Sequence, residues 1–261
     1  REKLTAGRNG IVVRTGKTDG RGGRYCRPHR RNIDIRCRPY RRKTGVRRPE
    51  SQIRMELIEK YFPELTPVQR ERFAALYDLY AAWNAKINVV SRKDFDQLYL
   101  RHVLHSLAIA KVCRFDDGAR VLDVGCGGGF PSVPLAILFP GAHFTAADSI
   151  RKKITVVEGV SQSLGLTNLT PRCVRVETLP ERCDYVVSRA VTAMPEFVEW
   201  IWSKIDRGQR GTLPNGILYL KGGDLAEELA RTGKRWDLYD IRTFFDEEFF
   251  ETKKVVYTPK K

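Results

Sequence analysis

The most informative stretch of the chain covers residues 122–131 and reads Leu122-Asp123-Val124-Gly125-Cys126-Gly127-Gly128-Gly129-Phe130-Pro131. It continues a short apolar, β-branched run that begins at Arg120, and this run predicts a buried strand. It leads into a predicted helix from Pro131 to Phe139. A loop with so few side chains lets backbone amides approach a nucleotide-like ligand closely. The sequence therefore predicts a strand, a glycine loop and a helix that together bind such a ligand.

The glycine spacing separates two classes of ligand that use a unit of this kind. A dinucleotide loop has G-x-G-x-x-G, whereas Gly129 comes one place early here and Phe130 stands where a small residue is needed. An acid two positions before the first glycine, Asp123, followed by G-x-G-x-G, resembles the first motif of Rossmann-like class I methyltransferases. Their cofactor, S-adenosylmethionine, is therefore expected. Asp148 ends the next predicted strand, where a ribose-binding carboxylate belongs.

Strand and helix signals alternate along the chain, which predicts an α/β fold. We expect a mostly parallel sheet with helices on both faces and an N-terminal helical extension. The carboxyl ends of its strands bring Gly125, Asp148, Val176 and Arg189 to one edge, where ligands bind. Helices are expected over residues 55–61, 66–84, 94–113, 131–139, 150–164, 195–205 and 224–232, and strands over 120–125, 143–148, 170–176, 183–189, 216–221, 239–244 and 253–258.

The net charge of +16 is concentrated at the N-terminus. Residues 1–49 hold 17 Lys and Arg against 3 acids, which is +14, and the remainder holds 30 against 28, which is +2. We expect three parts: a disordered Arg/Gly-rich tail (1–54), a helical extension (55–114) and a cofactor-binding methyltransferase domain (115–261). The tail is either an RNA arm or a dispensable leader, and the first methionine, Met55, favours the leader.

Several classes of protein are disfavoured by the composition. Neither an apolar run long enough to span a membrane nor a signal peptide is seen, so a cytoplasmic protein is expected. The six cysteines form no C-x-x-C pair and are interpreted as buried hydrophobes or free thiols. Cys26, His29 and Cys37 lack a fourth zinc ligand, and no metal is expected.

A set of short motifs recurs in a fixed order along the chain. They are Trp83-Asn84-x-x-x-Asn88, Arg101-His102-x-x-x-Ser106, the glycine loop with Phe130-Pro131, Asp148-Ser149 with Lys152-Lys153, Val176-Glu177 and Ser188-Arg189-Ala190. Over roughly residues 55–258 the chain resembles the bacterial 16S rRNA guanine-N7 methyltransferases. The resemblance implies 16S rRNA or a small-subunit precursor as partner, a monomer, and a catalytic role for Arg189. It also implies cofactor contacts from Gly125, Gly127, Phe130, Val176, Glu177 and Arg189. Asp148 is expected to join these contacts because of its place in the fold.

Two departures from that family and several alternatives remain. The family commonly has Asp where His105 stands and Gly where Ser132 stands. Asn84 and Asn88 either hold a loop or touch RNA, and His102 and His105 are expected to be structural. Because guanine N7 carries a lone pair and no proton, the expected reaction needs no general base. The alternative functions are methylation of a small molecule or protein on this scaffold, and RNA binding without catalysis.

Overall fold

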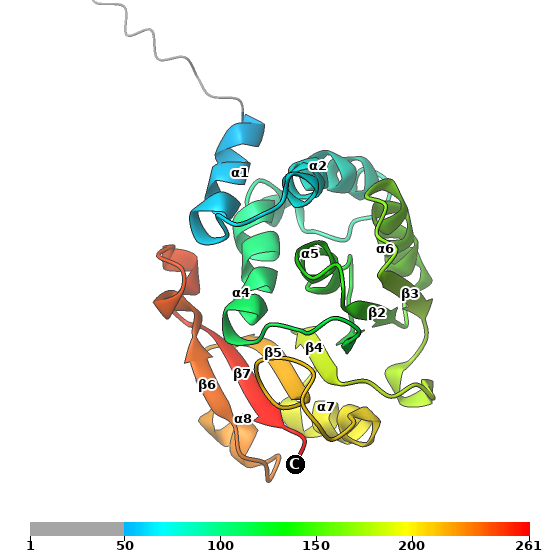
Figure 1. The fold of residues 1–261 in the computed structure, drawn as a ribbon, viewed down its shortest axis with the longest axis vertical. Coiled ribbons are helices and arrows are strands. Elements are labelled where there is room, and N and C mark those ends of the chain that lie inside the picture. The colour runs from blue at the N-terminus through cyan, green and yellow to red at the C-terminus, as the bar shows by residue number, and fades with distance from the viewer. Residues whose placement is uncertain (1–49) are drawn as a thin grey trace, which may run out of the picture. The chain divides into compact units, whose positions relative to one another are not determined.

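The sheet determines where the site lies. The computed structural model describes residues 50–261, and within them seven strands form one sheet in the order β3-β2-β1-β4-β5-β7-β6 (Figure 1). Strands β1 to β5 are parallel, and β7 runs antiparallel to both β5 and β6. The predicted mostly parallel sheet is therefore confirmed. The strands are β1 (Arg120–Val124), β2 (His143–Asp148), β3 (Leu169–Cys173), β4 (Tyr185–Arg189), β5 (Gly216–Gly222), β6 (Asp237–Asp240) and β7 (Lys253–Pro259).

Helices cover both faces of this sheet. Alternate residues of each strand point to opposite faces. On β1, Val121 joins a core with α1, α2, α4, α5 and α6, whereas Leu122 joins a core with α7 and α8 (Figure 1). The described helices are α1 (Glu50–Tyr61), α2 (Pro67–Asn84), α3 (Arg92–Phe95), α4 (His105–Val112), α5 (Ser132–Leu138), α6 (Arg151–Ser163), α7 (Met194–Ile201) and α8 (Ala226–Ala230), with a π-helix η1 (Tyr99–Leu104) and 3-10 turns η2 (Val176–Thr178), η3 (Trp202–Lys204), η4 (Ile241–Thr243) and η5 (Glu248–Phe250).

The N-terminal extension reaches the sheet through α4, which contacts β5 and β7, and it packs on helices α5 and α6 through α2. Thr66 and Gln69 form a capping box at its start, as Thr66-Pro67 predicts. Phe73, Leu76 and Tyr80 recur at helical spacing and are buried. Helix α1 begins at Glu50, earlier than the predicted Met55. The predictions for residues 1–49 lie outside the described residues.

Two predicted elements near the site differ from the structure. The helix expected over residues 94–113 is divided into α3, the π-helix η1 and α4, so Arg101 and His102 lie in a wider turn. Strand β3 ends at Cys173, because its partner β2 ends at the paired residue Asp148. Val176 therefore begins the turn η2 and lies beyond the strand end where we expected it.

Candidate active site

The glycine loop follows β1 at the edge of the sheet where the parallel strands end. Gly125, Gly127 and Gly129 all have positive φ, of 66°, 56° and 98°, which favours glycine. The backbone N–H of Gly125 donates to the carbonyl of Ala147 on β2 over 2.8 Å. From α2, the Tyr80 hydroxyl donates to the carbonyl of Gly128 over 2.7 Å. The loop is thus fixed by both the neighbouring strand and the N-terminal extension.

The glycines of the loop face different surroundings. A Cβ at Gly125 would lie 2.4 Å from the side chain of Val191, and one at Gly129 would lie 2.7 Å from that of Val133. A Cβ at Gly127 would meet nothing within 4 Å. Gly125 and Gly129 therefore allow the loop to pack within the protein, whereas Gly127 leaves room beside the loop.

Asp148 is tied to the glycine loop. Its Oδ2 accepts a hydrogen bond from the backbone N–H of Gly127 over 3.0 Å, and its Oδ1 accepts one from Ile150 over 2.8 Å. The Lys153 ammonium lies 3.6 Å from Oδ2. Asp148 is only 7% exposed, so its carboxylate is held in one place at the end of β2.

A pocket of about 290 Å³ lies beside this carboxylate, and we call it the loop pocket. Four of the predicted cofactor contacts line it together: Gly125, Asp148, Val176 and Glu177. The other three, Gly127, Phe130 and Arg189, are not among its lining residues in the part of the chain that the structure describes.

A second pocket of about 480 Å³ opens next to the first, and we call it the arginine pocket. Ala190 lines both pockets, so it lies where they meet. Its φ of 52° is unusual for a residue with a side chain and places it in a strained backbone region. The arginine pocket is lined by Asp94, Arg101, His102, His105, Arg189, Ala190, Leu220, Lys221, Gly222, Phe249 and Lys253.

Arg189 is fixed by contacts from the π-helix. One of its guanidinium nitrogens lies 2.9 Å from Nδ1 of His102, and the other donates to the carbonyl of Arg101 over 3.2 Å. The guanidinium also lies over the ring of Phe130, 5.5 Å from its centroid. Burial lowers the pKa of Arg189 to about 10, so the group stays charged at neutral pH. The structure thus places Phe130 against Arg189, and of these two only Arg189 lines the arginine pocket.

Both histidines of this region are neutral near pH 7. Burial, and then the charge of Arg189, lower the pKa of His102 to about 4. The same two causes, in the same order, hold the pKa of His105 well below its usual range. His105 is buried against the rings of Phe249 and Phe250. His105 thus packs against these rings and also lines the arginine pocket, and its structural role stays a prediction.

Asp123, the acid before the glycines, lies in the core. It is fully buried, and its Oδ2 accepts a hydrogen bond from the backbone N–H of Ser132 over 2.9 Å. Burial raises the pKa of Asp123 to about 7. This carboxyl group joins the end of β1 to the start of α5, on either side of the glycine loop. Pro131 precedes the first residue of α5 and was expected within that helix.

Asn84 resolves one of the alternatives left open. Its side chain accepts hydrogen bonds from the backbone of Val89 and Val90 and donates to the carbonyl of Val90. It therefore holds the loop after α2, and Val89 from that loop packs against Gly128. Asn88 is exposed and lies in that loop, outside the helix.

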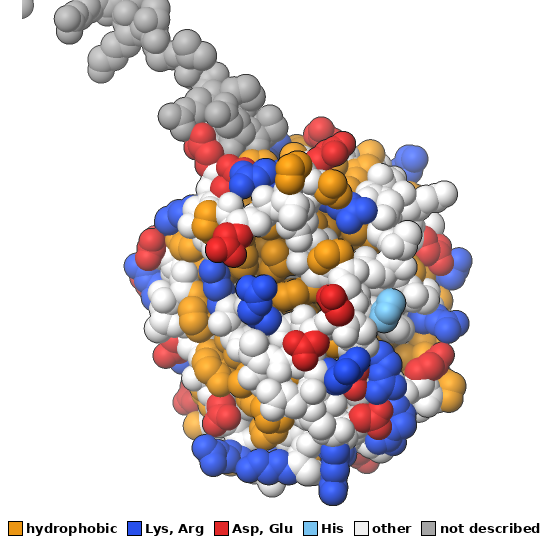
Figure 2. Space-filling view, in the orientation of Figure 1, with side chains coloured by type: hydrophobic (Ala, Val, Ile, Leu, Met, Phe, Trp, Pro, Cys, Tyr) orange, Lys and Arg blue, Asp and Glu red, His pale blue; other side chains and the backbone are white. Residues whose placement is uncertain are grey.

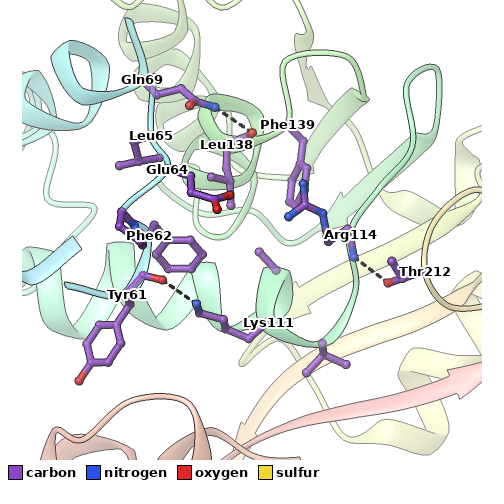
Figure 3. A pocket seen from close by; sticks show the side chains of 13 residues that line it. Tyr61, Phe62, Glu64, Leu65, Gln69, Lys111, Arg114, Leu138, Phe139 and Thr212 are labelled. Atoms are coloured by element: carbon purple, nitrogen blue, oxygen red, sulfur yellow. Dashed lines mark hydrogen bonds between the residues drawn. The ribbon is translucent and has the colours of Figure 1, made fainter. Parts of the chain in front are cut away.

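A cavity larger than these two pockets lies elsewhere. It measures about 680 Å³ and is lined by Phe62, Lys111, Arg114, Phe139 and their neighbours (Figure 3). These residues come from the α1–α2 loop and from segments just before β1 and β2. The cavity is therefore at the edge where these strands begin, opposite to the glycine loop.

Other features of residues 50–261 bear on the remaining predictions. Among these residues, no cluster of three or more His, Cys, Asp or Glu side chains could hold a metal ion. The Cys26, His29 and Cys37 alternative lies outside them.

The cysteines that the structure describes are free thiols. Cys113, Cys126 and Cys183 are buried, and Cys173 is exposed. No helix of this part of the chain is long and apolar enough to cross a membrane.

Three residues of the site were not predicted as such. Tyr80 lies within the helix predicted over residues 66–84 and had no role of its own there, and Ala190 appeared only as part of a motif. Lys253 was placed in a terminal strand without a role. The sequence gives no signal for contacts between segments so far apart along the chain. Position 190 gives none either, because its positive φ is usual for glycine and the residue there is alanine.

The chain is similar to proteins of one family over most of its length. Residues 69–254 match the family model GidB, described as rRNA small subunit methyltransferase G. Ribosomal RNA small subunit methyltransferase G of Cytophaga hutchinsonii is 56% identical over 205 residues, which cover 78% of this chain and 99% of that protein. The protein of the same name from Christiangramia forsetii is 56% identical over 209 residues, which cover 79% of this chain and 98% of that one. A solved S-adenosylmethionine-dependent methyltransferase from Aquifex aeolicus has 14% identity and a TM-score of 0.48, and the match covers 62% of this chain and 92% of that chain.

Proposed function

The chain belongs to the rRNA small subunit methyltransferase G family and is an S-adenosylmethionine-dependent rRNA methyltransferase, and we propose that the atom it methylates is N7 of a guanine. The observation that carries this proposal is the junction of the two pockets at Ala190. One pocket has the features of a cofactor site. The other is basic and contains the fixed guanidinium of Arg189. The arrangement supports methyl transfer across position 190.

The residues of the loop pocket suit the cofactor. A carboxylate has about four lone-pair sites, and Asp148 uses two of them for backbone N–H groups. Acceptor capacity therefore remains for the two ribose hydroxyls. Gly127 leaves open space on one side, and Glu177 is an exposed acceptor on the other. When bound, S-adenosylmethionine supplies a methyl group on a positively charged sulfur.

The arginine pocket suits a guanine that has left its base stack. Enzymes that act on a base within structured nucleic acid commonly extrude it into a pocket. Arg189 presents a planar group with several donors, which suits the acceptor-rich O6 and N7 edge of guanine. His102 and Phe130 hold that guanidinium, and Ala190 separates it from the loop pocket. We assign Arg189 the role of holding the base with N7 in line with the donated methyl group.

The protonation states favour a reaction without a general base. Guanine N7 has a lone pair and no proton, so the protein need not remove one before transfer. His102 is neutral, and its Nδ1 lone pair already accepts a hydrogen bond from Arg189. The residues nearest to Arg189 thus orient groups and hold charge, and none of them is required to accept a proton.

A matched pair of glycine variants tests the cofactor site. Gly127 and Gly165 have φ values of 56° and 60°, and a Cβ at either meets nothing closer than 3.8 Å. Each alanine substitution should therefore cost a similar amount of stability, roughly 1–2 kcal/mol. Of the two glycine variants, only Gly127→Ala should weaken S-adenosylmethionine binding. Asp148→Ala should weaken that binding more, by about 1.5–3 kcal/mol. Calorimetric titration measures these affinities. If Gly127→Ala and Asp148→Ala both bind S-adenosylmethionine as tightly as the wild type does, the assignment of the cofactor site is wrong.

A modified RNA tests the acceptor atom. Transcripts of the small-subunit rRNA in which 7-deazaguanine replaces guanine have a C–H group at the reacting position. We expect the enzyme to transfer labelled methyl groups to the unmodified transcript, or to subunits reconstituted with it. The substituted RNA should still bind to the enzyme but should receive no methyl groups. Continued methylation of the substituted RNA would move the reaction to another atom.

Three further assignments accompany this proposal. We place the enzyme in the cytoplasm, with bacterial small-subunit rRNA or its precursor as substrate. We expect it to act as a monomer, because residues of one chain line both pockets. We assign residues 115–261 as the methyltransferase domain and residues 55–114 as a helical extension, which contributes Tyr80 and His102 to the site.

A further inference from the structure

The arginine pocket contains an excess of positive charge that its own acids do not match. Arg101 forms an ion pair with Asp94, and Lys221 forms one with Glu228. Among the side chains that the structure describes, neither Arg189 nor Lys253 has a carboxylate within 4 Å. They nonetheless line the same pocket. Arg189 has the role proposed above, which leaves Lys253 to be explained.

Lys253 is directed toward the pocket by its neighbours on two sides. Its ammonium lies over the ring of Phe249, 5.5 Å from the centroid. Across the β5–β7 pairing lies Gly222, where a Cβ would come within 3.0 Å of both Cδ and Nζ of Lys253. The lysine side chain therefore lies in the space beside Gly222, and a larger residue at position 222 would require it to move. The side chain is half-buried and still opens on the pocket.

Phe249 is a shared support for two cations. The guanidinium of Arg101 also lies over its ring, 5.6 Å from the centroid. Arg101 comes from the π-helix and Lys253 from β7, so one aromatic ring positions charges from distant segments of the chain. Two cations held on one side of a pocket suit a ligand with a delocalised negative charge.

We propose that Lys253, positioned by Phe249, binds the backbone phosphate of the RNA next to the nucleotide whose base enters the arginine pocket. The proposal rests on the proposed function, since it requires RNA in that pocket. Lysine is a compact cation that contacts phosphate without reading sequence. Such a contact would fix the position of the extruded nucleotide while Arg189 orients its base.

The neighbouring lysine provides a matched control. Lys254 is the next residue of β7, so its side chain points to the opposite face of the sheet. It pairs with Asp240 on β6 and is not among the residues lining the arginine pocket in the described chain. Lys253→Met and Lys254→Met therefore remove the same charge from adjacent positions, and only the first should affect RNA binding at the site.

The experiment measures RNA affinity as a function of salt. We expect Lys253→Met to make the slope of log affinity against log salt shallower by roughly 0.7–0.9, the contribution of one phosphate contact. The affinity lost should then be about threefold larger at 50 mM than at 200 mM salt. The KM for RNA should rise while the cofactor Kd stays near wild type. Lys253→Arg should restore both affinity and slope, and Lys254→Met should leave them unchanged.

The outcomes separate this inference from the proposed function. If the wild-type chain methylates small-subunit rRNA but Lys253→Met keeps its affinity and salt slope, the phosphate contact is wrong and the proposed function stands. The same conclusion follows if Lys254→Met has the same effect as Lys253→Met, because the charge would then act nonspecifically. If Lys253→Met only lowers the melting temperature, with the slope unchanged, the lysine is structural. If the wild-type chain methylates no guanine N7, the proposed function itself fails.

Discussion

Arg189 donates a hydrogen bond to Nδ1 of His102 over 2.9 Å, and this contact fixes the state of both side chains. A guanidinium can only donate, so Nδ1 must accept and the proton of the neutral ring must lie on Nε2. Protonation of Nδ1 would place two cations against each other, which adds to the effect of burial in lowering the pKa of His102 to about 4. The histidine thus positions the arginine and is not free to act as a base.

Substitutions of His102 should separate positioning from proton transfer. Asn places an acceptor near the position of Nδ1, so His102→Asn should keep the single-turnover rate within a few-fold of wild type. His102→Leu removes the acceptor and should lower the rate by up to about tenfold. Arg189→Ala should lower it by roughly 10- to 150-fold, the effect expected for lost hydrogen bonds from a charged group. A base would instead be worth about 10²–10⁴-fold, so a hundredfold loss in His102→Asn with folding intact would refute the positioning role.

The pH dependence of the rate follows from the lowered pKa of His102. The folded protein keeps this histidine neutral from above pH 6.5 down to about pH 4, whereas the unfolded chain protonates it near 6.5. The unfolded state therefore binds more protons between pH 6.5 and 4, and stability falls as pH decreases through that window. We expect His102 to contribute no inflection near pH 6.5 to single-turnover rates at saturating substrates. An inflection there that disappears in His102→Asn would contradict this assignment.

The sequence predicts the parts of the site that lie close together along the chain. The glycine loop and Asp148 follow β1 and β2 by local rules of strand, turn and helix, and the structure has β2 over the predicted residues His143–Asp148. Because parallel strands end at one edge, the loop and the carboxylate could be placed together from the order of the strands alone. Their hydrogen bond, from Gly127 to Asp148, depends on that edge.

The arginine pocket could not be predicted in the same way. Its cations come from the π-helix, β4, β5 and β7, and a near-neutral charge count beyond residue 49 conceals their convergence. On the face shown in Figure 2, acidic and basic side chains are interspersed, as that count suggests. The π-helix arises where the predicted helix over 94–113 is interrupted, and a helical pattern alone does not predict such an interruption. Ala190 adopts a backbone conformation that its residue type does not favour.

Position 190 should tolerate little added volume. Ala190 lies between the two pockets with a φ of 52°, which a β-branched residue adopts poorly. Ala190→Val should lower kcat at least tenfold by blocking the approach of base and methyl group. Ala190→Gly suits the same φ and should keep both kcat and melting temperature near wild type. Single-turnover rates and thermal melts check both, and normal turnover by a folded Ala190→Val protein would show that the methyl group does not pass this residue.

The boundary of the N-terminal extension can be tested by truncation. A chain that begins at Glu50 keeps all of α1, and we expect it to keep the melting temperature and the methylation rate at physiological salt. A chain that begins at Met55 loses part of α1 and the contact of Arg54 with the ring of Tyr77. Its melting temperature should fall by about 2–4 °C for each kcal/mol lost. A large loss of rate in the Glu50 chain would instead assign an RNA-binding role to the residues before it.

The identity of the methylated nucleoside tests the central claim most directly. Small-subunit rRNA, both protein-free and in assembled subunits, is incubated with the enzyme and isotopically labelled S-adenosylmethionine, digested to nucleosides and analysed by mass spectrometry against standards. The account predicts one labelled product, 7-methylguanosine, which is formed by the wild-type chain and strongly reduced with Arg189→Ala. A labelled nucleoside methylated at any other atom would contradict the proposed reaction and the role of Arg189 in it.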